Sequence, residues 1–159
     1  MTIPGPPVDT TPVADSAPHL DWVAPVLSRL SLTYTRFRIG KPGTAVATRA
    51  VLGTTIRFML SEDATVTFIF ERVRSGQAVG STCVAPSAAR TNAKSCKRYS
   101  VIENALTRQS LAGANLVSFS GRIGALALKP GAYRLGLIAT DARNNRSPIE
   151  HLAFTVVTN

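Results

Sequence analysis

The sequence predicts an all-β fold, namely an immunoglobulin-like antiparallel sandwich of seven to eight strands. Two of its features indicate an all-β chain. Short runs of alternating apolar and polar residues recur along it, and Gly, Pro, Asn and Asp separate these runs. Alternation between turn residues is typical of strands that place one face on a core. A chain of 159 residues with 45% hydrophobic content is long enough for one domain with a real core.

The clearest strand lies within Pro130–Ser147. A Pro-Gly turn opens this segment, and a polar turn, Asp141–Asn145, closes it. Between the turns, four apolar residues alternate with the rest and are expected to face inward: Tyr133, Leu135, Leu137 and Ala139. We expect this to be the penultimate strand of the sandwich.

Further strands are expected on both sides of it. A first strand over Val26–Phe37 is expected to bend near Thr33–Arg36 and to change sheets. Two alternating runs, Thr54–Leu60 and Ala64–Val73, suggest a hairpin around the turn Ser61–Asp63. Later strands are expected over Asn115–Gly121 and His151–Val157. The residues predicted to face the core in these runs are Leu30, Leu32, Ile56, Phe58, Leu60, Val66, Phe68, Phe70, Val117, Phe119, Leu152, Phe154 and Val156.

Residues 1–24 are predicted to form a Pro-rich linker ahead of a domain at 25–159. Proline lacks the donor needed for a strand ladder and favours extended chain, so a semi-extended tether is expected. Trp22 either tucks against the domain edge or stacks on a sugar. No basic and apolar signal segment is evident at the start, and no stretch approaches the length of a membrane span. If the domain is exported, the chain is expected to be a mature fragment or a piece of a longer protein.

A basic insertion interrupts the pattern at about 74–110 and contains both cysteines, Cys83 and Cys96. One pair offers too few ligands for zinc, so a disulfide that closes the insertion is favoured over two free thiols. A disulfide would imply an extracellular or cell-surface location. Within the insertion, Tyr99–Glu103 suggests a short strand, and Glu103–Thr107 a helical turn.

The formal charge of +9 comes from 18 Lys and Arg against nine Asp and Glu. Such a surface attracts anionic polymers, although an Arg-rich composition on solvated strands would give the same total. Nucleic acid is disfavoured, because the basic loop has a single aromatic neighbour, Tyr99, where base stacking requires several. The candidate contacts for an anionic ligand are the cations of the insertion, namely Arg74, Arg90, Lys94, Lys97, Arg98 and Arg108.

Catalytic and metal signals are weak. Ser147, His151 and Asp141 contain the side chains of a hydrolase triad, but no nucleophile elbow accompanies them. Glu62 and Asp63 are explained by a turn. The loop residues Asp141, Asn144 and Asn145 offer oxygen ligands to calcium, yet a polar turn capped by Asp141 explains them as well. We therefore predict no catalytic residue, no cofactor and no enzyme.

The string GANLVSFSGRIGALALKPGAYRLGLIATDARNNRS, residues 113–147, resembles the end of immunoglobulin-like modules in secreted proteins of high-GC Gram-positive (actinobacterial-type) bacteria. APVLSRLSL at Ala24–Leu32 and GTTIRFMLSEDATVTFIFER at Gly53–Arg72 are similar to their earlier strands. The likeness covers about residues 24–157 and extends to fibronectin type III-like modules, in which Tyr133 would be the tyrosine corner. Asn144 replaces the usual Gly, a departure that a left-handed Asn tolerates.

This resemblance implies a non-catalytic extracellular module that acts as a spacer, in cell adhesion or in contact with the cell envelope. The alternative is a carbohydrate-binding accessory domain of a larger secreted enzyme. The expected partners are neighbouring modules, or an anionic polymer or polysaccharide of the envelope.

Overall fold

The computed structural model describes residues 22–40, 52–102 and 105–158, and this part of the chain is all-β. It contains twelve strands and one short 3-10 helix, η1. The predicted linker at 1–24 lies almost entirely outside the described residues. The strands are β1 (Leu27–Leu32), β2 (Arg36–Arg38), β3 (Thr54–Leu60), β4 (Ala64–Val79), β5 (Thr82–Val84), β6 (Ser95–Val101), β7 (Leu106–Ser110), β8 (Gly113–Phe119), β9 (Arg122–Ile123), β10 (Leu126–Ala127), β11 (Gly131–Thr140) and β12 (Glu150–Val157), and η1 spans Ala88–Arg90.

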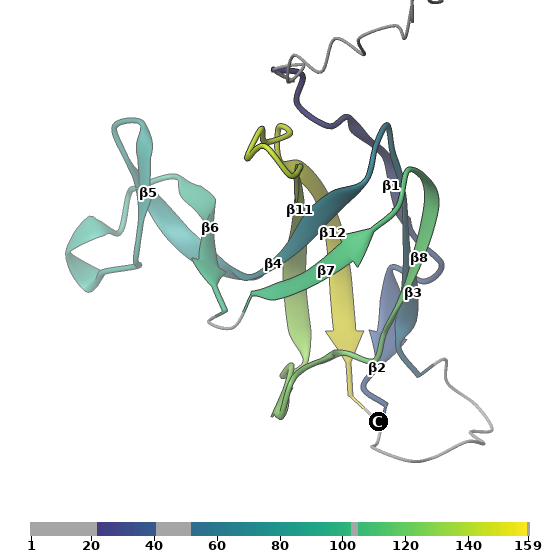
Figure 1. Cartoon of the computed structure of the whole chain (residues 1–159). Coiled ribbons are helices and arrows are strands. Elements are labelled where there is room, and N and C mark those ends of the chain that lie inside the picture. The colour runs from purple at the N-terminus through teal and green to yellow at the C-terminus, as the bar shows by residue number, and fades with distance from the viewer. Residues whose placement is uncertain (1–21, 41–51, 103–104, 159) are drawn as a thin grey trace, which may run out of the picture.

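Two sheets enclose the core (Figure 1). The smaller has the order β1-β3-β8. The larger has the order β2-β12-β11-β4-β5, and β6 and β7 also pair with β4. All its pairings are antiparallel except that of β2 with β12, which is parallel. The larger sheet is therefore mixed and not purely antiparallel as predicted, whereas the smaller sheet is antiparallel throughout. β9 and β10 form a separate small hairpin.

The first predicted strand does bend and change sheets, as expected. β1 pairs with β3 in the smaller sheet, whereas β2 pairs with β12 in the larger one. The turn between them is held by hydrogen bonds from the Thr33 backbone to the Thr55 carbonyl and from the Tyr34 backbone to the Thr54 hydroxyl, both 3.0 Å.

The predicted hairpin of Thr54–Leu60 with Ala64–Val73 is wrong. β3 pairs with β1 and β8, and β4 pairs with strands of the other sheet. The turn at Ser61–Asp63 thus crosses from one sheet to the other. Both strands still direct alternate residues inward, so Phe58 and Phe68 meet edge to face across the core, with ring centroids 6.1 Å apart. Periodicity specifies an inward face but not which sheet a strand joins.

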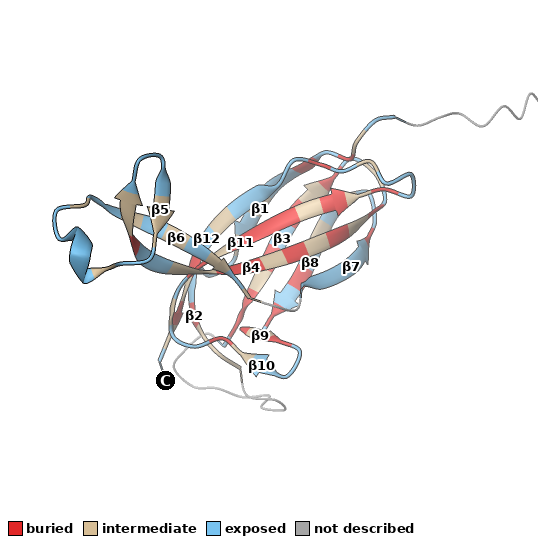
Figure 2. Ribbon diagram, turned by 90° about the vertical axis from the view of Figure 1, so that its left-hand side faces the viewer, coloured by how far each residue is buried: buried red, intermediate tan, exposed pale blue. Residues whose placement is uncertain are grey.

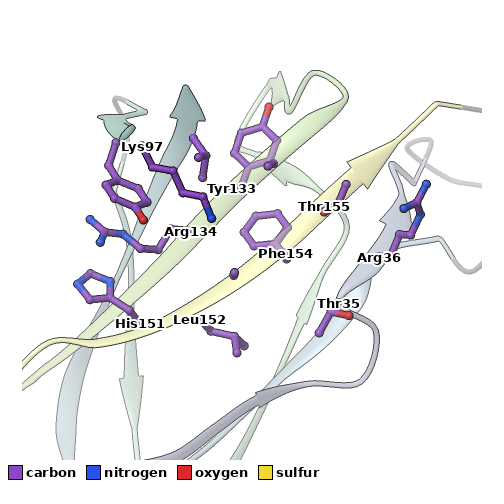
Figure 3. Close-up of a pocket in the computed structure, with 13 residues that line it drawn as sticks. Thr35, Arg36, Lys97, Tyr133, Arg134, His151, Leu152, Phe154 and Thr155 are labelled. Atoms are coloured by element: carbon purple, nitrogen blue, oxygen red, sulfur yellow. The ribbon is translucent and has the colours of Figure 1, made fainter. Parts of the chain in front are cut away.

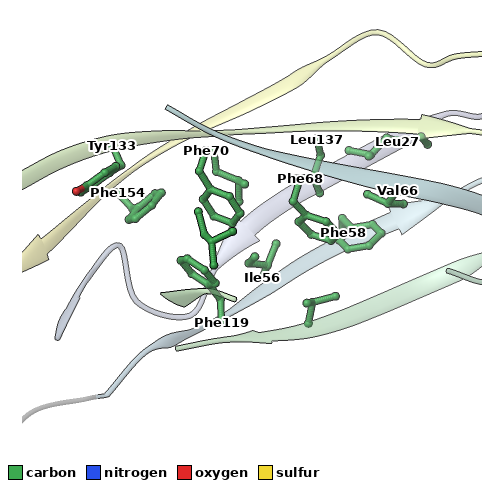
Figure 4. Close-up of a cluster of buried hydrophobic side chains, with 14 of the residues drawn as sticks. Leu27, Ile56, Phe58, Val66, Phe68, Phe70, Phe119, Tyr133, Leu137 and Phe154 are labelled. Atoms are coloured by element: carbon green, nitrogen blue, oxygen red, sulfur yellow. The ribbon is translucent and has the colours of Figure 1, made fainter. Parts of the chain in front are cut away.

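All six phenylalanines are buried in one core, together with Tyr133. Figure 4 shows this core, with Phe58, Phe68, Phe70, Phe119 and Phe154 labelled. Phe70 stacks on Phe119, and Phe154 stacks on both Phe37 and Tyr133. The alternation predicted for β3, β4, β8, β11 and β12 is confirmed, since their predicted inward residues are buried apart from the partly buried Leu152. Offset and edge-to-face rings contribute about 0.5–1.5 kcal/mol per pair beyond area burial.

The two ends of β11 are fixed by side-chain hydrogen bonds. At its start, the Tyr133 hydroxyl donates to the Lys129 carbonyl at 2.5 Å. Beyond its end, both oxygens of Asp141 accept hydrogen bonds within the loop that follows. Asn144 in this loop has φ 67°, the left-handed geometry that the sequence anticipates.

The expected insertion is an ordered arm, which we define as residues 74–101: the outer part of β4 with β5, η1 and β6. β4 runs to Val79, six residues past its predicted end, and pairs with both β5 and β6. The arm projects from the two sheets and carries little of the buried colour that marks their core (Figure 2). The predicted helical turn is wrong where it is described, because Leu106 and Thr107 begin strand β7.

The disulfide between Cys83 and Cys96 joins β5 to β6 within the arm, as predicted. Gly76 of β4, paired with Cys96, lies beneath it. A Cβ at Gly76 would come within 2.5 Å of the Cys83 sulfur and 2.7 Å of the Arg98 side-chain stem. The absence of a side chain at this position lets the disulfide and the arginine stem pack on the strand.

Candidate functional site

The larger sheet is hollowed on its outer face, which is the face turned away from the core (Figure 3). Pairing places Arg36, Thr155 and Ala132 side by side across β2, β12 and β11. Ala153 lies beside Arg134 in the next row. Small side chains therefore form the floor, and longer ones from β2 and β6 stand at its two sides. The hollow measures about 610 Å³, within the usual range for small-ligand sites.

One wall of the hollow is a layered stack of three side chains. Arg134 forms a bidentate ion pair with Glu71, its cross-strand neighbour, at 2.6 and 3.0 Å. The hydrogen bond to Glu71 raises the pKa of the Arg134 guanidinium above its already high ordinary value, so it is a permanent cation. The Tyr99 ring lies on this guanidinium, 3.5 Å from its central carbon to the ring centroid. The stack fixes an aromatic ring on the arm against the sheet.

Three more basic side chains line the hollow: Arg36 on β2, Lys97 on β6 and His151 on β12. The ion pair of Arg134 with Glu71 is the sole salt bridge found among the described residues. Arg36 and Lys97 therefore have no acidic partner within that part of the chain. The hollow presents uncompensated positive charge around an aromatic ring and is suited to an anionic ligand.

The six predicted anionic contacts do not form one site. Arg74 and Arg98 are cross-strand neighbours on the arm, and Lys97, on the opposite face of β6, lines the hollow. Arg90 lies in η1, where its guanidinium donates to the Ala85 carbonyl at 3.2 Å. Lys94 lies in the loop before β6, and Arg108 lies on β7, outside the arm.

The sequence analysis missed Arg36 and Arg134. Both belong to strands outside the insertion, whereas all six predicted contacts lie within it. Arg134 alternates with the inward Tyr133 and Leu135, so its outward direction was predictable. What periodicity does not supply is the pairing of β2 with β12, which brings Arg36 to the same face.

The calcium candidates at Asp141, Asn144 and Asn145 form a self-bonded loop. One Asp141 oxygen accepts from the Arg143 and Asn145 backbone N–H groups at 2.8 Å, and the other from the Asn145 amide at 2.7 Å. Burial would raise the pKa of Asp141, but these hydrogen bonds lower it overall. Across the described residues, no three His, Cys, Asp or Glu side chains gather as a metal cluster would.

The side chains of the candidate triad make contacts that belong to the fold. The Ser147 hydroxyl is buried, accepts from the Ala139 backbone and donates to the Pro148 carbonyl, each at 2.9 Å. His151 is exposed, and its ring lies over Gly136. Asp63 accepts from the Ala112 backbone N–H at 2.7 Å and so ties two turns together.

Trp22 is 77% exposed, so the expectation that it tucks against the domain edge is wrong. Its stacking on a sugar stays a prediction. Within the described ranges, no helix has the length and apolar character needed to cross a membrane. No family model matches the chain, and no curated protein matches it either.

Proposed function

We propose that this protein is a non-catalytic, extracellular immunoglobulin-like module that contacts an anionic polysaccharide of the cell envelope through the hollow. The immunoglobulin-like assignment is supported by a β1-β3-β8 sheet that faces a β2-β12-β11-β4 sheet. Tyr133 also supports it, because its hydroxyl bonds to a carbonyl four residues upstream, as a tyrosine corner does. The disulfide is compatible with an oxidising, extracellular location.

The observation that carries the binding role is the placement of Arg36 and Lys97 at the two sides of the hollow, of which the Tyr99–Arg134 stack forms one wall. Arg36 and Arg134 are rooted two strands apart, about 10 Å at ordinary strand spacing. An extended acidic chain lying across the floor of small residues would meet both cations and the ring. The carboxylates or other anions of the polymer would serve as the acidic partners that Arg36 and Lys97 lack within the described residues.

The test is binding to polygalacturonate, compared with neutral dextran, for the wild type and two charge-matched variants. Arg36→Gln with Lys97→Gln removes two cations from the hollow. Arg57→Gln with Arg146→Gln removes two exposed cations elsewhere. At an ionic strength of about 0.15 M, we expect the first variant to weaken binding about tenfold or more, since contacts to charged groups are the stronger ones.

The control variant should change the affinity far less. Equal losses in the two variants would mean that net charge alone attracts the polymer, and the hollow would not be its site. Tighter binding of single-stranded DNA than of polygalacturonate would contradict the polysaccharide class.

A carbohydrate-binding accessory domain is the second candidate, favoured by the exposure of Trp22 and Tyr99. In that case, neutral saccharide binding would survive high salt, because stacking on a ring is not screened. Trp22→Ala should then abolish it, with Arg57→Gln as the control. Binding of neutral saccharide that persists in both variants would exclude Trp22 as its platform.

A further inference from the structure

A second group of cations lies at the foot of the arm, on the face opposite the hollow. Arg72 and Arg74 are two residues apart on β4 and therefore point to the same side. With Ser100 of β6 and Lys129, they line a cavity of about 240 Å³. No residue that lines it carries a carboxylate. We call it the Arg72–Arg74 pocket.

Arg72 is held in position without an acidic partner among the residues that the structure describes. Its guanidinium donates to the Pro130 carbonyl at 3.1 Å and lies 5.9 Å from the centroid of the Tyr133 ring. Burial raises the pKa of the Tyr133 phenol, whereas the charges of Arg72 and Arg74 act to lower it. Arg72, Arg74 and Tyr133 line the same cavity, so both arginines lie beside the tyrosine.

The position of Arg74 is expected to lower the stability of the fold. It pairs directly with Arg98 of β6 across the ladder, and like charges in that position are destabilising. Arg98 has a packing reason for its position, since its stem covers Gly76. No hydrogen bond or ion pair explains Arg74 within the described part of the chain. A bound anion would offset the repulsion.

We propose that the Arg72–Arg74 pocket binds a tetrahedral oxyanion, a phosphoryl or sulfate group. Guanidinium groups present several donors in a fixed plane that matches such anions. Two of them, with the Lys129 ammonium and the Ser100 hydroxyl, would surround its oxygens. This inference is independent of the polysaccharide proposal, because no cation is shared between the two sites.

The experiment measures Arg Nε–H signals by NMR during titration with inorganic phosphate, sulfate or acetate at constant ionic strength. We expect phosphate and sulfate to shift the signals of Arg72 and Arg74 until the shifts saturate. Acetate should bind with an affinity at least about tenfold lower. Arg74→Gln should weaken phosphate binding about tenfold. Arg57→Gln and Arg36→Gln should leave the affinity for phosphate at this pocket unchanged. Arg36 lines the hollow, so Arg36→Gln affects only the polysaccharide proposal.

Thermal unfolding supplies an independent measurement. Without phosphate, Arg74→Gln should raise Tm, because it removes the repulsion with Arg98. With phosphate, the wild type should gain more stability than the variant. Acetate binding as strong as phosphate, equal weakening by Arg57→Gln, or a lower Tm of the variant without phosphate would overturn the proposal.

Discussion

Asp141 shows how one side chain organises a turn that resembles a ligand site. Three hydrogen bonds from its own loop converge on its carboxylate. The same residue types were predictable from the sequence as oxygen ligands or as a cap. Only the positions of the backbone N–H groups distinguish a self-satisfied turn from one that directs its oxygens outward.

The lowered pKa of Asp141 predicts a pH dependence of stability. A group whose pKa is lower in the folded state stabilises the fold above its ordinary value, here 3.8. That stability is lost as the pH falls through the folded value. Asp141→Asn should therefore lower Tm at neutral pH, and the difference from the wild type should shrink as the pH falls below 3.8.

Thermal unfolding followed by circular dichroism over this pH range is the measurement. Glu150→Gln, at the exposed start of β12, is the matched control and should leave Tm nearly unchanged. A difference between Asp141→Asn and the wild type that stays constant into acid would contradict the assigned role of the carboxylate.

At the scale of elements, the arm depends on its disulfide more than the sheets do. Of its residues, Gly76 is the only buried one, so no apolar core holds it. Its described links to the rest of the chain include the β4 ladder and the Tyr99–Arg134 stack, whereas the disulfide joins β5 to β6 within the arm. Such a segment is expected to open locally at lower free energy than the core.

Replacing both cysteines, Cys83→Ser with Cys96→Ser, should therefore loosen the arm selectively. A loop of this length contributes about 3 kcal/mol in the chain-entropy account. We expect faster amide hydrogen exchange in β5 and β6 and unchanged exchange in β3 and β11. Accelerated exchange in all four strands would show that the arm and the sheets unfold as one unit.

The strands themselves were largely predictable, but their partners were not. The bounds of β3 and the inward residues of β11 follow from alternation and turn residues. The hairpin prediction failed because the turn at Ser61–Asp63 connects two sheets. Most of the strands of the arm were not predicted, because β6 alternates exposed and half-buried residues without an apolar face. The hollow joins β2, β12, β11 and β6, so it required pairings that no local pattern encodes.

The whole molecule carries excess positive charge, formally +9, while one ion pair is found among the described residues. Repulsion between like charges should therefore outweigh attraction in the unliganded protein. Raising the ionic strength from about 0.01 M to about 0.15 M shortens the Debye length from about 30 Å to about 8 Å. We expect sodium chloride to raise Tm over this range at neutral pH.

Scanning calorimetry of the wild type checks this expectation. The gain should diminish as the pH approaches the sequence pI of about 10.6, where the net charge vanishes. A Tm that falls with added salt would mean that attractive pairs dominate.

The parallel pairing of β2 with β12 also determines how the fold would bear tension. Three consecutive pairs join Arg36–Arg38 to Thr155–Val157. A pull on the chain before β2 and after β12 would act in opposite directions along these two strands. Their hydrogen bonds would then be loaded together in shear and would not open one at a time. Force applied between these two points would load this short ladder first, and with it Phe37, which belongs to both the ladder and the phenylalanine core.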